Sequence, residues 1–401
     1  MPSIRKIGVG TVLISEQAKK NVMEALNANR LSYGPFLNRF ENKFAELHNR
    51  KFAISCNSGT SALQIALGAL KEIHFWKDGD EVIVPAITFI ATSNIVLQNG
   101  LKPVFVDVDP ATYNIDSSKI EAKITKKTKA IIPVHLFGLS AEMEPIMKLA
   151  RRRNLKIIED SCETMFVNYK GKPVGSRGDI SCFSTYAAHL IVTGVGGLAL
   201  TNNPKYAVVM KSMMNHGRDS IYLNIDADDK LKNEKEVFKM ADRRFSFIRM
   251  GYSFRLTELE GALGVAELQT RQTNLRKRLS NAEYLIKNLS KYFQYIQLPD
   301  WPNYSEHAFM MFPIVIKSKK INRSRFITFL EKNGIETRYM MPLLNQPYYK
   351  KIFGNLEDKY PVAKWINRNG FYIGCHQNLN KDDLDYIVSI FDKFFSNESK
   401  K

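Results

Sequence analysis

Residues 52–63 read FAISCNSGTSAL, an apolar segment followed by small and hydroxyl-bearing residues and then by the start of an apolar helical pattern. Similar short segments rich in β-branched residues recur, each separated from the next by a helical pattern, at Glu81–Pro85, Pro103–Val108, Ala130–His135 and Lys156–Asp160. This alternation predicts an α/β fold with a mostly parallel central sheet and helices on both faces. Functional residues are then expected in the loops that follow the strands.

The second half of the chain has a different pattern. Apolar residues recur at near-helical spacing across Thr257–Leu289, which predicts one long helix. Beyond it, Ala308–Ile316 has the pattern of a strand, and Ser324–Asn333 and Lys381–Phe395 have the pattern of helices. The predicted organisation is an N-terminal arm (1–25), a large domain (26–256), a linking helix (257–290) and a smaller C-terminal α+β domain (291–401).

Composition limits the class of protein. The 401 residues exceed what one compact core usually supports, and the 44% hydrophobic and 24% charged content argues against a disordered or fibrous chain. The sequence has no signal-peptide architecture and no apolar run of membrane-spanning length, so a cytoplasmic protein without a membrane partner is expected. Its four cysteines lack metal-ligand spacing, which predicts free thiols and no metal site.

The formal net charge is +18, which raises the possibility of a nucleic-acid partner. The basic residues, however, are spread through 123–129, 271–278 and 317–325, and they do not form one basic region with interleaved aromatic residues. A solvated basic surface is therefore favoured over a nucleic-acid site. Such a surface can also help to attract an anionic metabolite.

Three segments carry candidate chemistry. Backbone N–H groups at the helix start of Ser58-Gly59-Thr60 suit a phosphate, although a plain helix cap explains them equally well. The strand that ends in Asp160 provides a carboxylate that could pair with a protonated ring nitrogen, although a helix cap is the simpler interpretation. The third segment runs from Asp179 to His189 and is followed by the glycine-rich turn 193–197.

In this order and spacing, the three segments resemble the fold-type-I, pyridoxal-phosphate-dependent aminotransferases and dehydratases of nucleotide sugars, the DegT/StrS group. The resemblance extends over nearly the whole chain, from Gly34-Pro35 through GDEVIVP at 79–85, PVHLFG at 133–138 and NHGR at 215–218 to GYSFR at 251–255. It implies an aspartate-aminotransferase-like fold and a homodimer with shared active sites.

The resemblance also implies roles for individual residues. Ser58, Gly59, Thr60 and Ser184 would bind the cofactor phosphate through amide and hydroxyl donors. Phe89 would stack on the pyridine ring, since an aromatic face suits a flat ring.

Further roles concern the edge of the cofactor. Asp160 would keep the ring nitrogen protonated. Glu163, where family aminotransferases usually have glutamine, would lie near the 3′ oxygen. Ser253 stands where many relatives have an asparagine that reaches the phosphate of the neighbouring subunit, and it can still donate a hydrogen bond.

One position departs from the aminotransferases. His189 occupies the place of the lysine that forms the internal Schiff base, and no lysine occurs between Lys172 and Lys205. Imidazole does not form a stable imine, so the cofactor is expected to bind noncovalently, with pyridoxamine phosphate as the resting form. Histidine can still exchange protons near neutral pH.

A histidine at this position is similar to the sugar 3-dehydratases of the group. That similarity implies proton transfer by His189 while the carbon-3 hydroxyl of a nucleotide-linked 4-keto-6-deoxyhexose is expelled, with glutamate re-aminating the cofactor. No cysteine lies between Cys182 and Cys375, which makes a four-cysteine iron–sulfur cluster improbable. The chain therefore resembles the iron-free branch that acts on GDP-4-keto-6-deoxymannose, in deoxysugar and O-antigen biosynthesis.

Two other functions remain open. One is a nucleotide-sugar aminotransferase, including a variant in which histidine has replaced the lysine. The other is a sugar-nucleotide-binding relative without turnover, in which His189 is only structural. His216 and Arg218 are candidates for contacting substrate or a partner subunit, and a surface role is equally compatible with their position. These residues do not identify the nucleotide or the stereochemistry of the sugar.

Overall fold

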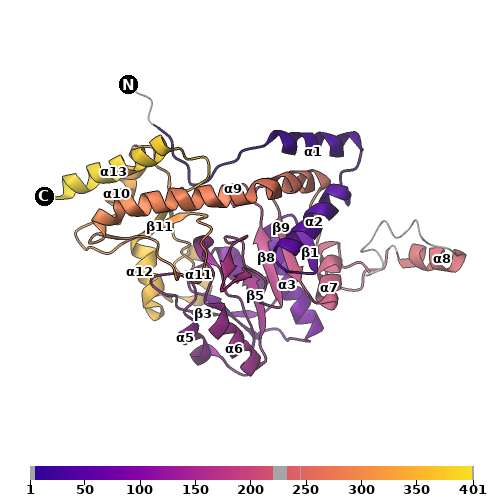
Figure 1. Cartoon of the computed structure of the whole chain (residues 1–401). Coiled ribbons are helices and arrows are strands. Elements are labelled where there is room, and N and C mark those ends of the chain that lie inside the picture. The colour runs from indigo at the N-terminus through magenta and orange to yellow at the C-terminus, as the bar shows by residue number, and fades with distance from the viewer. Residues whose placement is uncertain (1–4, 220–232, 244, 400–401) are drawn as a thin grey trace.

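The computed structural model describes residues 5–219, 233–243 and 245–399 (Figure 1). Its core is a seven-stranded sheet with the strand order β1-β9-β8-β5-β4-β2-β3. The strands of this sheet are β1 (Phe52–Cys56), β2 (Glu81–Pro85), β3 (Lys102–Val106), β4 (Thr128–Ile131), β5 (Lys156–Asp160), β8 (Ile180–Ser184) and β9 (Gly197–Thr201). Strand β9 runs antiparallel to β1 and β8, and the other pairs are parallel. The expected mostly parallel sheet is confirmed.

Helices surround this sheet and extend away from it. The α-helices are α1 (Glu16–Asn27), α2 (Pro35–Leu47), α3 (Gly59–Ile73), α4 (Ile90–Gln98), α5 (Ser117–Ile120), α6 (Met143–Arg153), α7 (Pro204–Met214), α8 (Glu234–Arg243), α9 (Glu258–Leu289), α10 (Arg323–Lys332), α11 (Pro347–Phe353), α12 (Pro361–Asn369) and α13 (Lys381–Ser399). Short 3-10 helices are η1 (Glu121–Lys123), η2 (Leu136–Gly138), η5 (Ser290–Tyr292) and η6 (Glu357–Lys359). No helix among the described residues is long and apolar enough to cross a membrane.

Helix α3 is the most deeply buried helix next to the sheet. It packs against β1, β5, β8 and β9 and against the neighbouring helices α4 and α7. Its sequence explains this position, because apolar side chains such as Leu63, Leu67 and Leu70 leave almost no surface exposed. Its first turn is fixed by the Ser58 hydroxyl, which accepts a hydrogen bond from the Ser61 N–H.

A second sheet has its own hydrophobic core. Its four antiparallel strands lie in the order β10-β11-β13-β12, with bounds Ile296–Gln297, Phe312–Ile316, Gly370–Ile373 and Thr337–Tyr339 respectively. Phe326 of α10 and Phe391 of α13 are fully buried against it. A separate two-stranded ribbon pairs β6 (Asn168–Tyr169) with β7 (Lys172–Pro173). The division into domains at the residue numbers given above stays a prediction.

The long helix α9 matches the expected helix closely, and it begins with a capping box formed by Thr257 and Glu260. Helices α1 and α2 pack along it, and Figure 1 shows α1 lying near one end of α9. The carboxylate of Glu258, which is buried, accepts hydrogen bonds from the backbone N–H groups of Gly34, Phe36 and Leu37 at 3.0, 2.6 and 3.0 Å. A negative charge at the start of α2 therefore joins two helices that are more than two hundred residues apart in sequence.

Three expected strands end or begin elsewhere, for local reasons. The segment expected to end at His135 stops at Ile131, since Pro133 has no N–H to continue the ladder. Strand β3 stops at Val106, after which Val108 pairs with Ile115 in an isolated bridge. Strand β11 begins only at Phe312, because the residues before it pair with η2 instead of with the sheet. There the N–H of Ala308 donates a hydrogen bond to the carbonyl of Gly138.

We predict that Glu258→Gln lowers the free energy of unfolding of the cofactor-free protein by about 2–4 kcal/mol. The amide loses the negative charge and offers one acceptor to three buried N–H donors. Urea denaturation followed by circular dichroism measures this change. Glu283→Gln, an exposed position on the same helix, is the matched control and should differ little from wild type. Equal stability of the two variants would show that the Glu258 contacts contribute nothing measurable.

Candidate active site

The carboxyl edge of the central sheet brings together the ends of β5 and β8 with the start of α3. Asp160, the last residue of β5, is buried, and its Oδ2 accepts a hydrogen bond from the Thr92 hydroxyl of α4 at 2.8 Å. Its Oδ1 accepts from the backbone N–H of Cys162 at 3.2 Å. Burial raises the pKa of Asp160, while these two hydrogen bonds act in the opposite direction. A cationic group that binds here would therefore meet a carboxylate that is buried away from solvent.

The start of α3 forms a close-fitting cradle. A Cβ atom on Gly59 would lie 2.8 Å from both Cys162 Sγ and Ser184 Cβ, so only glycine fits at this position. Ser58 forms a parallel bridge with Gly196 of the glycine-rich turn. These contacts place Ser58, Gly59, Thr60 and Ser184 at one helix N-terminus, which is where backbone N–H groups favour a phosphate.

His189 is held in a closed loop next to that cradle. The loop is pinned by a bridge between Tyr186 and Gly194, and a turn joins the His189 N–H to the Tyr186 carbonyl at 2.9 Å. Glu267 of α9 accepts a hydrogen bond from the N–H of Val192 at 3.2 Å. The loop is thus attached both to the sheet and to the long helix.

The hydrogen bonding of His189 assigns its protons. Its Nδ1 lies 2.6 Å from the backbone carbonyl of Cys162, and because a carbonyl only accepts, Nδ1 must carry the hydrogen. Nε2 is then an acceptor, and among the described residues it makes no hydrogen bond. Burial lowers the pKa of His189 to about 4, opposed by the bond to Cys162 and aided by the positive charge of Arg278. A neutral, half-buried ring with a free Nε2 is suited to accept a proton.

Glu163 lies three residues after Asp160, the last residue of β5. Its Oε2 accepts a hydrogen bond from the N–H of Phe137 at 2.8 Å. Burial raises the pKa of Glu163 to about 7, and the nearby charge of Asp160 acts in the same direction. Near neutral pH this side chain exists in both protonation states.

Phe89 and Ser253 make no direct hydrogen bond to Asp160 or His189 among the described residues, but they lie near residues that contact this site. Phe89, at the N-terminus of α4, exposes 58% of its surface, one turn before the Thr92 that contacts Asp160. Ser253 is exposed, but the next residue, Phe254, accepts a hydrogen bond from the N–H of Asn57 at 2.7 Å, directly before Ser58. Phe89 and Ser253 thus lie close in sequence to residues that contact Asp160 and the segment before α3.

His216 and Arg218 differ from one another. His216 Nε2 lies 3.4 Å from Arg255, whose guanidinium also donates to the Ser253 hydroxyl at 3.1 Å. The guanidinium of Arg218 instead lies over the rings of Phe245 and Phe247, at 5.8 and 5.7 Å. His216 is therefore linked to the Ser253 segment, whereas no contact in the described structure links Arg218 to His189 or Asp160.

Two groups in the site were missed by the sequence argument. Thr92 is recognisable only as a hydroxyl one helical turn from Thr88, with which it shares a hydrogen bond of 2.7 Å. The carbonyl of Cys162 leaves no sequence signal, because any residue supplies one. The cysteines themselves are all free, as expected. Among the described residues, no group of three His, Cys, Asp or Glu side chains could hold a metal ion.

Comparison with known proteins places this geometry in a family. The model of the DegT/DnrJ/EryC1/StrS aminotransferase family matches residues 12–392. The chain belongs to this family. Its members are pyridoxal-phosphate-dependent enzymes that act on nucleotide sugars, both aminotransferases and dehydratases.

Relatives of both kinds are similar to this DegT-family chain. It is 32% identical over 396 residues to the GDP-perosamine synthase of Caulobacter vibrioides, covering 98% of this chain and 99% of the relative. It is 29% identical over 401 residues to the GDP-4-keto-6-deoxy-D-mannose 3-dehydratase of Yersinia pseudotuberculosis, covering 97% and 100%. The Escherichia coli enzyme of that name, solved with bound hydrated PLP, superposes with a TM-score of 0.87 at 26% identity, covering 96% and 100%.

The site of this DegT-family chain fits pyridoxal phosphate. The N-terminus of α3 has the donors and the clearance for a phosphate, since Gly59 brings no side chain into the cradle. The buried carboxylate of Asp160 has a raised pKa that a protonated ring nitrogen would reverse. The exposed ring of Phe89 is available for stacking.

We predict that His189 of the cofactor-free protein is neutral and in the Nδ1–H form at about pH 6, where a free histidine is largely protonated. Burial and the hydrogen bond to Cys162 require this form. Nitrogen NMR of histidine-labelled protein measures it, and the His189→Gln variant assigns the signal. A midpoint at or above the ordinary value of 6.5 would contradict the geometry.

Glu163 should make stability depend on pH. Its folded-state pKa of about 7 exceeds the ordinary 4.5, so the folded chain binds the extra proton between these values. The contribution of Glu163 to the free energy of unfolding of the cofactor-free protein should therefore fall by on the order of 3 kcal/mol as the pH rises through this window. Buried histidines such as His189 contribute the opposite slope, so the Glu163 contribution is measured as the difference between wild type and Glu163→Gln. Glu163→Gln should remove that share of the slope, whereas Glu283→Gln should retain it. Urea denaturation at a series of pH values measures the free energy of unfolding of each variant. If the plots of this free energy against pH were parallel for wild type and Glu163→Gln, the raised pKa would be disproved.

Proposed function

We propose that this chain is a 3-dehydratase of a nucleotide-linked 4-keto-6-deoxyhexose that uses pyridoxamine and pyridoxal phosphate. The observation that carries the proposal is His189, which stands where the family aminotransferases have a lysine and whose Nε2 is free to accept a proton. When bound, the cofactor supplies an amine that can attach to the sugar ketone and a ring that can accept electrons. The residues of the chain then bind, orient and move protons.

Asp160 holds the ring nitrogen in its protonated state, and its own position is fixed by Thr92 and the Cys162 N–H. The first turn of α3 and Ser184 would bind the phosphate, and Phe89 would stack on the ring. These contacts would hold the cofactor noncovalently, because His189 stands in place of the lysine that would attach it.

His189 accepts a proton at Nε2, while the Cys162 carbonyl holds Nδ1–H in place. The lowered pKa of His189 keeps the ring unprotonated at neutral pH and therefore ready to act as a base. Once protonated, the buried ring is a strong acid and can return the proton to the departing carbon-3 hydroxyl. The positive charge of Arg278 favours that return.

The proposed enzyme has two partners, an amino donor and a second copy of the chain. Glutamate is the proposed amino donor that regenerates the aminated cofactor. We also propose a homodimer with shared active sites, in which Ser253, exposed in the single chain, reaches the cofactor phosphate of the second copy. Val12, Leu13 and Ile14 are more than half exposed, and apolar side chains in the N-terminal arm suit burial by a second copy.

Transamination of the same keto-sugar is the second candidate, favoured by the higher identity to GDP-perosamine synthase. The two reactions differ in their products. Purified protein should therefore be incubated with pyridoxamine phosphate, glutamate and 4-keto-6-deoxy sugars linked to GDP or CDP. We expect ammonia and a sugar product that has lost one hydroxyl, detected by mass spectrometry. An amino-sugar would replace the dehydratase proposal with the aminotransferase, and binding without turnover would indicate a regulatory relative.

Variants at His189 test the base itself. His189→Gln should lower dehydration by about 10²–10⁴-fold, the usual contribution of a general acid–base group, while cofactor absorbance after gel filtration stays near that of wild type. His189→Lys should also weaken dehydration and should attach the cofactor covalently, as measured by protein mass after borohydride reduction. Full dehydratase turnover in His189→Lys would overturn the proposed role of His189.

A further inference from the structure

A hollow lies at the edge of the central sheet opposite the candidate active site. It is bounded by the starts of β4 and β5 and by the C-terminal ends of α3 and α6, and its cavity volume is about 760 Å³. The five-residue strand β5 separates Lys156, which lines the hollow, from Asp160 in the active site by about 13 Å. This hollow is therefore distinct from the site proposed for the cofactor. Its size is within the range of about 300–1,000 Å³ that small-molecule pockets occupy.

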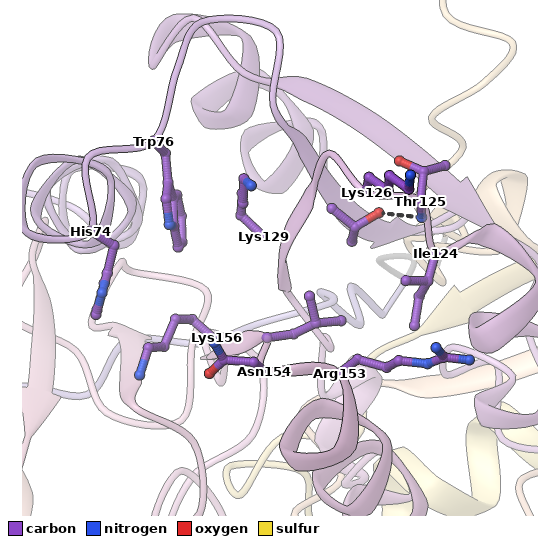
Figure 2. Close-up of a pocket in the computed structure, with 11 residues that line it drawn as sticks. His74, Trp76, Ile124, Thr125, Lys126, Lys129, Arg153, Asn154 and Lys156 are labelled. Carbon is purple, nitrogen blue, oxygen red and sulfur yellow. Dashed lines mark hydrogen bonds between the residues drawn. The ribbon is translucent and has the colours of Figure 1, made fainter.

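Cations and aromatic rings dominate the lining of this hollow, and among the described residues no carboxylate is part of that lining. Figure 2 shows them around one opening, with His74 and Trp76 at one side and Lys129 between that side and Ile124. The cationic and aromatic residues are Lys126, Lys129, Arg153, Lys156, His74 and Trp76. Like charges gathered around one opening repel one another, and an anion placed among them relieves that repulsion.

Part of this charge already has a structural partner. Arg153 pairs with Glu121 at 2.7 Å and lies in the last turn of α6, where a cation favours the helix dipole. Lys156 pairs with Asp179 at 3.3 Å. Lys126 and Lys129 are therefore the cations most available to a ligand.

Lys126 and Lys129 are less well compensated. Lys129 Nζ lies 3.9 Å from Oδ2 of Asp80, at the limit of an ion pair. Lys126 is exposed and, among the described residues, forms no ion pair. Lys126 lies in the turn just before β4 and Lys129 is the second residue of that strand, so the backbone holds both at the rim of the hollow.

The aromatic wall adds a second kind of contact. The rings of His74 and Trp76 are nearly parallel, at 22° and with their centroids 6.0 Å apart. His74 is fixed by a hydrogen bond of 2.8 Å between its Nε2 and the hydroxyl of Tyr206. Trp76 remains partly exposed and borders the hollow, and an indole face suits stacking with a flat base.

We propose that this hollow binds a nucleoside polyphosphate, with the phosphates held by Lys126 and Lys129 and the base stacked on Trp76. The ligand chemistry follows from two weakly compensated lysines at the rim, next to an aromatic face. The site differs from the active site in location and in residues. It is independent of which reaction the chain catalyses.

Isothermal titration calorimetry with ADP on the full chain loaded with pyridoxal phosphate tests the proposal. The double variant Lys126→Glu/Lys129→Glu should weaken ADP binding by at least about tenfold, since each lost charged hydrogen bond contributes more than 1 kcal/mol. The matched control, Lys319→Glu/Lys320→Glu, makes the same charge change at exposed positions outside the hollow and should change the affinity less than about twofold. No ADP binding by wild type, or equal losses in both double variants, would overturn the proposal.

A second measurement tests the nucleoside part. Trp76→Ala should weaken the binding of ADP by several-fold while leaving the binding of inorganic tripolyphosphate unchanged, because only ADP carries a base. Cofactor absorbance, measured for each variant, verifies that the fold is intact. Equal effects of Trp76→Ala on ADP and tripolyphosphate would overturn the assignment to a nucleoside.

Discussion

The buried carboxylate of Glu159 is the interaction on which the arrangement of the active site depends. It accepts hydrogen bonds from three backbone N–H groups within residues 175–178, at 2.6–3.1 Å, and lies 3.1 Å from Nε2 of His135. His135 Nδ1 accepts from the N–H of Ala141, so its Nε2 is the nitrogen that donates to Glu159. Arg50 adds a longer ion pair at 3.4 Å. One side chain thus fixes the end of β5 to the segments on either side.

Two adjacent carboxylates on β5 therefore have opposite environments. Both are buried, and burial alone disfavours a charge on either of them. For Glu159 the surrounding donors, His135 first among them, outweigh burial and lower its pKa to about 2. For Asp160 burial prevails and the pKa is raised. Because successive side chains of a strand point to opposite faces, the chain anchors the strand with one acid and leaves the next one available.

Much of this could be predicted from sequence, and what could not has a physical reason. Periodicity located β1, β2, β5 and α9, since a buried face repeats along each of those elements. Contacts between distant segments carry no periodic signal. The hydroxyl of Thr92 beneath Asp160 and the Cys162 carbonyl that orients His189 were found only in three dimensions.

The basic hollow shows the same limit. The lysines of 123–129 were interpreted as a solvated surface, because sequence alone did not reveal that they face Arg153 and Lys156 across one opening. Residues in three separate segments, 74–76, 124–129 and 153–156, meet there. Charge counts along a chain therefore underestimate how strongly charge is concentrated in the fold.

Beyond its contacts with α1 and α2, helix α9 makes hydrogen bonds to further parts of the molecule along its length. Glu267 holds the loop of His189, Arg278 donates to the carbonyls of Phe309 and Met310, and Asn281 donates to the carbonyl of His376. One inserted or deleted residue between Glu267 and Arg278 would rotate every later side chain by about 100° and remove the last two contacts together. As such proteins diverge, α9 can change in composition but hardly in length, so insertions and deletions must accumulate in the loops instead.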